Sequence, residues 1–156
     1  MMTLLCAVVS SAWADDVFYT LTPTKGTNNN YASNCDIDIN SITWNLTGNS
    51  QMVPWRIGGK SLSNVDREVY SKTAMDAAIT KVDLTVGGAS NITVNSLKLT
   101  VASNADFSDV LDEVTVTFKA NSTITFEPSN GTKWNMGAYD KLTFNVSVSG
   151  DSNKFV

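Results

Sequence analysis

The chain of 156 residues carries 11 lysines and arginines against 15 aspartates and glutamates, has a net charge of −4 at pH 7, and contains no histidine. This length suits a single domain whose core packs without metal or disulfide support. The scattered basic residues form no stripe that could follow a phosphate backbone, so we expect no nucleic-acid partner. Without histidine, Ser-His-Asp and Cys-His catalytic sets and histidine-ligated zinc are excluded.

The first residues have the composition of the end of a secretory signal peptide. Residues 3–14 are apolar or small, and Ala12-Trp13-Ala14 fits the small-x-small cleavage pattern, although no basic region precedes them. The apolar run is too short to span a bilayer. We therefore predict an incomplete signal peptide at 1–14 and a single domain at 15–156 with no membrane span. This domain would be secreted and located in the periplasm, on the cell surface or outside the cell.

Alternating apolar and polar residues predict short β-strands along the mature chain. The first is expected at 17–22, and the alternation resumes at 34–46 with a turn or bulge near Asn40-Ser41, where it shifts. The charged segment 65–74 is expected as an edge strand with Val69 pointing inward. The final residues 154–156 resemble the start of another strand, so we expect the sequence to be part of a longer protein.

Residues 79–103 carry the strongest pattern in the sequence. Two alternating runs flank Gly87-Gly88, and they predict a long β-hairpin with one apolar face that a second sheet must cover. The alternation slips near Asn95-Ser96, which predicts a β-bulge there.

Turn residues and short apolar runs continue to the end of the chain. A loop at 104–112 anchored by Phe107 is expected before strands at 114–118, 124–126 and 142–148. Many short strands, frequent turns and no long helix predict an all-β fold, a two-sheet antiparallel β-sandwich that is jelly-roll-like.

The acidic residues offer little catalytic chemistry. Asp36 and Asp38 would share the polar face of a strand, where neighbouring carboxylates are usually solvated, so we predict that the protein is not an enzyme. Loop oxygens of Asp106, Asp109 and Asp112 are weak candidates for calcium, because their spacing does not match an EF-hand loop and a solvated loop explains them as well. No cofactor other than calcium is expected.

Aromatic side chains on or next to turns and strand ends are the best ligand-binding candidates, with arginines as polar groups beside them. β-Sandwich domains that bind glycans stack sugar rings on aromatic side chains and flank them with polar groups. Trp44 shares its parity with Ile42 and Leu46, which assigns it to the core. For Trp134 and Tyr139, core and exposed positions remain open. The candidate ligand-binding residues are Trp134, Tyr139, Trp55, Arg56 and Arg67.

Several stretches of the sequence resemble a known kind of domain. These are 55–61 (WRIGGKS), 70–74 (YSKTA), 79–82 (ITKV), 95–97 (NSL) and 101–108 (VASNADFS). They resemble secreted β-sandwich domains, similar to carbohydrate-binding modules, from surface and extracellular proteins of gut-dwelling anaerobic Gram-negative bacteria. The resemblance covers nearly the whole mature chain. It implies an exported β-sandwich but carries over no ligand residues.

Two functions agree with these observations. The first is a non-catalytic extracellular accessory module that binds a polysaccharide or cell-surface glycan, or attaches to a surface, and it requires exposed aromatics in one shallow cluster. The alternative is a structural spacer or adhesin domain without a small-molecule ligand, in which the same aromatics are buried. An enzyme would instead need two carboxylates facing each other across a cleft.

Overall fold

The computed structural model describes residues 32–39, 41–52, 55–57, 64–87, 92–131 and 133–148. These residues form β-strands and no helix. The signal peptide predicted at 1–14 and the strand predicted at 17–22 lie outside the described residues. In chain order the strands are β1 (Ala32–Ile39), β2 (Ile42–Met52), β3 (Trp55–Ile57), β4 (Val65–Ser71), β5 (Val82–Val86), β6 (Ile92–Ala102), β7 (Val110–Val116), β8 (Ser122–Phe126) and β9 (Tyr139–Val148).

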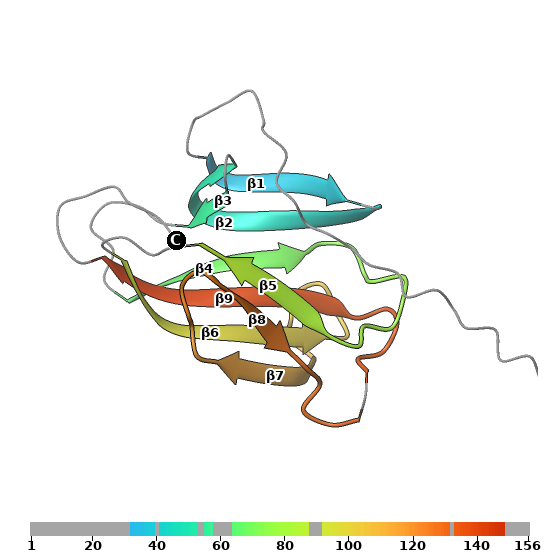
Figure 1. Cartoon of the computed structure of the whole chain (residues 1–156). Coiled ribbons are helices and arrows are strands. Elements are labelled where there is room, and N and C mark those ends of the chain that lie inside the picture. The colour runs from blue at the N-terminus through green and yellow to red at the C-terminus, as the bar shows by residue number, and fades with distance from the viewer. Residues whose placement is uncertain are drawn as a thin grey trace, which may run out of the picture.

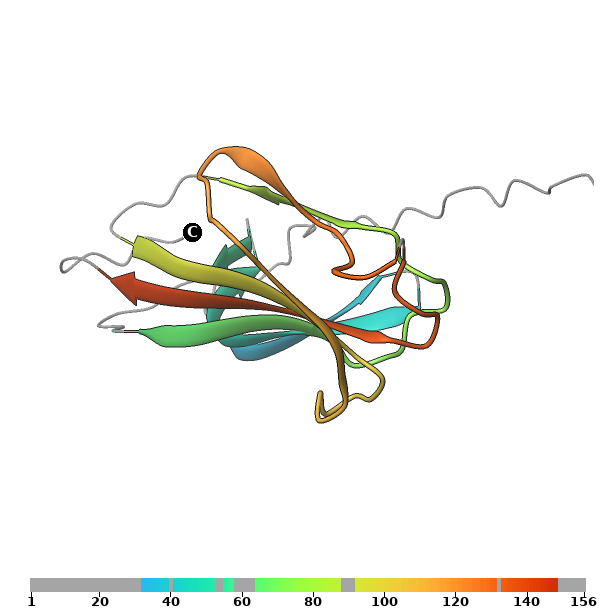
Figure 2. The ribbon, with the colours of Figure 1, turned by 90° about the horizontal axis from the view of Figure 1, so that it is seen from below.

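The strands pair into two antiparallel sheets, which confirms the all-β class (Figure 1). A seven-stranded sheet has the order β1-β2-β4-β9-β6-β7, with β3 pairing to β2, and a two-stranded sheet contains β5 and β8. Figure 2 shows the β5–β8 sheet lying over one face of the large sheet. We call this covered side of the large sheet the inner face, and the opposite side the polar face.

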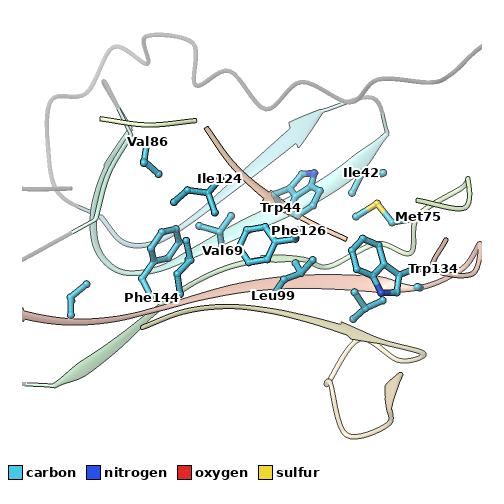
Figure 3. Packing of buried hydrophobic residues seen from close by; sticks show 14 residues of the cluster. Ile42, Trp44, Val69, Met75, Val86, Leu99, Ile124, Phe126, Trp134 and Phe144 are labelled. Carbon is cyan, nitrogen blue, oxygen red and sulfur yellow. The ribbon is translucent and has the colours of Figure 1, made fainter. Parts of the chain in front are cut away.

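The hydrophobic core lies between the inner face and the β5–β8 sheet (Figure 3). Leu97 of β6 and Val146 of β9 contribute to it from the large sheet, and Phe126 of β8 from the small one, and each of these side chains is fully buried. Burying one such side chain stabilises the fold by roughly 1.5–3 kcal/mol. Trp44 also belongs to this core, as its parity in the sequence predicted.

The period of two in β9 explains why the large sheet has one apolar and one polar side. Phe144 and Val146 are buried on the inner face, while Thr143 and Asn145 project from the polar face. Cross-strand partners share a face, so the same division extends to the neighbouring strands.

Two local predictions are confirmed. At the alternation shift between β1 and β2, Ser41 lies in a turn and has a φ of 67°. The register of β6 against β9 slips between Val94 and Ser96, so the β-bulge occurs and leaves Asn95 as the extra residue.

The predicted hairpin at 79–103 is wrong. β5 pairs with β8 in the small sheet, whereas β6 pairs with β9 and β7 in the large one. Consecutive strands with apolar faces can either pair or lie in opposite layers, because both arrangements bury the same residues. The alternation in the sequence does not distinguish them.

The positions of β4 and β7 also differ from expectation. β4 is not an edge strand but lies between β2 and β9, and its charged residues Asp66 and Glu68 occupy the polar face of a central strand. β7 begins at Val110, inside the predicted loop at 104–112. Within the described residues, no helix is long and apolar enough to cross a membrane.

Candidate functional site

Trp134 lies in the core, so its indole ring is not free to stack on a ligand. The residue is 4% exposed, and its backbone pairs with Ile79 in an isolated β-bridge. The indole Nε1 donates a hydrogen bond of 2.8 Å to Oδ2 of Asp112 on β7. A buried indole N–H needs an acceptor, and Asp112 provides it, so Trp134 has the packing of a structural residue.

Tyr139 and Arg67 lie on opposite sides of the large sheet. Tyr139 is the half-buried first residue of β9, whereas Arg67 of β4 is the cross-strand partner of Phe144 on the inner face. Tyr139 lies an odd number of positions from Phe144 along β9, which puts the two on different faces. Arg67 is partly buried, its Nε has no hydrogen-bond partner, and burial lowers the pKa of its guanidinium. These two candidates therefore do not share a site.

The backbone of Trp55 and Arg56 forms β3. Their cross-strand partners are Met52 and Gln51 of β2. The side chains of Trp55 and Arg56 are not among the described parts of the structure, so their predicted role in ligand binding stays a prediction.

The calcium candidates do not converge. Oδ1 of Asp106 accepts hydrogen bonds from the backbone and side chain of Ser108, and Asp109 accepts one from the Ser103 hydroxyl. Asp112 accepts from Ser129 and Trp134. Among the described residues, no group of three or more potential ligands could hold a metal ion. Each carboxylate accepts hydrogen bonds from its own donors, and these bonds stabilise the loop after β6 and the contact between β7 and Trp134.

The polar face of the large sheet brings together polar side chains from strands that are far apart in the sequence. Side chains from six strands project from it in cross-strand rows. They include Asp36 and Asp38 of β1, Thr43 and Asn45 of β2, Asp66, Glu68 and Tyr70 of β4, Lys98 and Thr100 of β6, Glu113 and Thr115 of β7, and Lys141, Thr143 and Asn145 of β9. Asn45 and Thr100 are buried among their neighbours, and the other side chains in this set are partly or fully exposed.

An aromatic group stands at one end of the polar face, and we call it the Phe107 cluster. The ring of Phe107 meets the ring of Tyr70 edge-on at 6.1 Å between centroids. The Nζ of Lys141 lies 4.6 Å from the centre of the Phe107 ring and 3.6 Å from Oε1 of Glu68. The cluster thus joins both strands of the β4–β9 pair to the loop that follows β6.

Phe107 is held in this position by a strained turn. Its φ of 58° lies in the left-handed region, which is uncommon for a bulky side chain. Asn104 fastens the turn on both sides, because its Nδ2 donates to the Ser108 hydroxyl at 2.8 Å and its Oδ1 accepts from the backbone N–H of Asp109 at 3.2 Å. The hydrogen bonds that hold this backbone offset its strain and fix the ring over the sheet.

A network of amides and hydroxyls covers another part of the polar face. The Nδ2 of Asn95, the bulged residue, lies within 3.0 Å of oxygen atoms of Asn64, Asn145 and Ser147. Asn145 in turn donates to Oδ1 of Asp66 at 2.7 Å. All five side chains are fixed by one another, and all remain partly or fully exposed. The bulge in β6 therefore has a visible effect, because it aims an additional amide at this network.

Ion pairs connect the charged residues of the polar face. Lys72 bonds Asp36 at 2.7 Å, and Lys98 bonds Glu113 at 2.7 Å. Hydrogen bonds from Lys72 and Asn45 hold the pKa of Asp36 below its usual value. The hydrogen bond from Lys98 does the same for the pKa of Glu113. Both carboxylates are therefore ionised at neutral pH.

Asp140 of β9 is a buried acid apart from this face. It is 4% exposed on the inner face opposite Val101, and its Oδ1 has no hydrogen-bond partner. Its backbone N–H donates to the Ser71 hydroxyl at 2.9 Å. Burial raises the pKa of Asp140 to about 7, which makes it the one strongly perturbed carboxyl in the described structure.

Sequence reasoning missed Tyr70 as a site residue and placed Phe107 only as a loop anchor. The alternation of β4 could have located Tyr70, because its neighbour Val69 was correctly expected to point inward. No local pattern reveals that the loop after β6 folds back onto β4, since that contact depends on β4 being central in the sheet.

Comparison with known proteins gives no match, since no family model, no curated protein and no solved structure shows significant similarity to the chain.

Proposed function

We propose that the chain is a non-catalytic accessory module of an exported protein and that it binds a polysaccharide or cell-surface glycan on the polar face of its large sheet. The observation that carries this proposal is the combination of a preordered amide and hydroxyl network with the Phe107 cluster on one exposed face. Glycans are recognised through hydroxyl hydrogen bonds and through stacking of their C–H faces on aromatic rings.

The order already present in this network supports binding. The side chains of Asn95, Asn145 and Asp66 hold each other in place, so little rotamer entropy remains to be lost when a ligand arrives. A polysaccharide is extended, and an open sheet face suits an extended ligand better than a closed pocket does.

The proposal includes the finer fold and the location suggested by the sequence. In it, the β5–β8 sheet is the second layer of a jelly-roll-like β-sandwich, and residues 1–14 direct the chain out of the cytoplasm. It assigns no catalysis, because Asp36 is engaged by Lys72 and Asn45, and Asp38 by Thr43. Glycoside hydrolysis requires two carboxyl groups that face each other across a cleft, whereas these hydrogen bonds are typical of carboxylates on the polar face of a strand.

Calorimetric titration of the purified chain with a panel of plant, mucin and microbial polysaccharides tests the proposal. We expect Tyr70→Ala to weaken binding about tenfold, because the Phe107 cluster loses one of its two rings. Thr143→Val, which removes one hydroxyl from the polar face while keeping the strand shape, should weaken it by a smaller factor. Thr123→Val on the exposed side of the β5–β8 sheet is the matched control and should bind like the parent chain.

The proposal fails if the folded chain binds nothing in the panel, or if Thr123→Val weakens binding as much as Thr143→Val. The melting temperature of each variant is measured alongside, so that loss of folding is separated from loss of contacts.

A structural spacer or adhesin domain is the second candidate, and the burial of Trp44 and Trp134 favours it. Two of the tryptophans that could have formed a ligand platform are instead part of the core. A chain that is folded and stable but inert toward the whole glycan panel would support the spacer function.

A further inference from the structure

We infer that the glycan accepted by the polar face is neutral and carries no uronate, sialate or sulfate groups. This inference rests on the proposed function and narrows its ligand to one chemical class. It follows from the charges of the polar face, from their pairing and from the uncharged hydrogen-bonding groups that lie among them.

Carboxylates outnumber ammonium groups on this face. Its described acidic side chains are Asp36, Asp38, Asp66, Glu68 and Glu113, and its described basic side chains are Lys72, Lys98 and Lys141. An anionic ligand lying on the sheet would therefore meet an excess of like charge at distances where screening by salt is incomplete.

Each of the three lysines is already paired with a carboxylate of the same face. Lys72 holds Asp36, Lys98 holds Glu113, and Lys141 lies between Glu68 and the Phe107 ring. Binding of a sulfate or carboxylate by one of these lysines would break an existing pair and leave a second carboxylate unpaired beside the ligand. Among the described side chains of the polar face, no cation is free to receive an anionic group.

Uncharged donors and acceptors lie between the ion pairs. Thr143 is central on the face, opposite Glu68 and Lys98, and the amides of Asn95 and Asn145 lie farther along the same strands. Amide and hydroxyl groups both donate and accept hydrogen bonds, as sugar hydroxyls do. This arrangement matches a polyhydroxyl ligand without ionised substituents.

A pair of ligands with the same backbone and different charge provides the test. Homogalacturonan is used as the de-esterified polygalacturonate and as its fully methyl-esterified form, together with the neutral polysaccharides xyloglucan, galactomannan and mixed-linkage β-glucan. We expect the chain to bind at least one neutral probe with little dependence on sodium chloride concentration, and polygalacturonate about tenfold more weakly than its methyl ester.

A gain-of-binding variant makes the test independent of which neutral glycan is preferred. The double variant Glu68→Gln with Glu113→Gln removes the partners of Lys141 and Lys98, and with them the excess of negative charge on the polar face. It should acquire salt-sensitive affinity for polygalacturonate. The control Asp83→Asn, on the β5–β8 sheet, makes the net charge less negative by one unit without changing the polar face and should not acquire this affinity.

The outcomes separate the two proposals. If the parent chain binds polygalacturonate as tightly as the methyl ester, or binds only anionic probes, the inference is overturned while glycan binding stands. If the folded chain binds none of the probes, the proposed function is overturned and the inference with it. An unchanged affinity of the double variant for polygalacturonate would also contradict the inference.

Discussion

Asp140→Asn tests the buried acid on the inner face. The carboxyl of Asp140 is almost inaccessible to water, and its Oδ1 has no hydrogen-bond donor. An ionised carboxylate in such a place is costly, which is why burial raises the pKa of Asp140 from 3.8 to about 7 in the folded chain.

The sign and size of the effect of Asp140 on stability follow from the thermodynamic linkage between proton binding and folding. Between pH 3.8 and about 7 the folded chain keeps a proton on Asp140 that the unfolded chain has released, so stability falls as the pH rises through this range. Well above pH 7 Asp140 is ionised in both the folded and the unfolded state, and the free energy of unfolding falls no further from this cause. One pKa unit corresponds to about 1.4 kcal/mol, which gives a total loss on the order of 4 kcal/mol at neutral to basic pH.

The Asp140→Asn variant has no carboxyl to titrate at this position. We therefore expect the difference in unfolding free energy between the variant and the parent chain to shift in favour of the variant by roughly 4 kcal/mol from about pH 4 to about pH 8. Urea titrations at half-unit pH steps measure this difference. The other carboxylates titrate equally in both proteins, so their contributions cancel from the difference. The cost of burying the hydrogens of the new amide does not change with pH, so it does not affect the shift between the two pH values.

Asp36→Asn provides a control with the opposite sign. Its carboxylate has a lowered pKa because Lys72 and Asn45 donate hydrogen bonds to it. The variant should be less stable than the parent at neutral pH, and the two should converge as the pH falls and the parent's Asp36 becomes protonated. A difference for Asp140→Asn that stays constant across the pH range would show that the pKa of Asp140 is not raised in the folded chain and would refute this reasoning.

Other expectations concern the core and the loops. Trp134→Phe keeps most of the buried ring but removes the donor to Asp112, and chemical denaturation should show a loss of about 1–3 kcal/mol; no loss would mean that this hydrogen bond contributes nothing. Phe126→Ala empties a fully buried position and should cost about 3–5 kcal/mol, while Thr125→Ala beside it should cost under about 1 kcal/mol; equal costs would contradict the assignment of β8 faces. Calcium or EDTA should leave the melting temperature unchanged, because the candidate ligands have separate partners, and a calcium-dependent rise would contradict the loop geometry described for Asp106, Asp109 and Asp112.

Much of the secondary structure could be predicted because alternation is a local property. Large parts of β8 and β9, the shift near Ser41 and the bulge at Asn95 follow from which residues are apolar. The strand predicted at 114–118 overlaps β7 only at 114–116, because β7 begins at Val110 and ends at Val116. Pairing is not local. The alternation of β5 and β6 predicts that each strand buries one face, but it does not predict whether the two strands belong to the same sheet.

The candidate site is harder to predict from local patterns than the strands are, because its residues come from distant parts of the sequence. Trp134 has polar neighbours in the sequence, and its buried indole N–H donates to Asp112, which is 22 residues away. The Phe107 cluster brings together a loop and two strands that no spacing rule connects. The charges of Asp66 and Glu68 indicate that one face of β4 is exposed, but they do not indicate whether β4 lies at an edge or in the middle of the sheet.

The place of β9 in the large sheet has a consequence for how the protein is made. This strand comes last among the described elements, yet it lies in the middle of the sheet and pairs with β4 on one side and β6 on the other. While the ribosome is still producing the preceding residues, β4 and β6 lack the neighbour that joins them, and the two halves of the sheet cannot assemble. Truncation before Tyr139 would therefore leave an unfolded chain rather than a smaller domain.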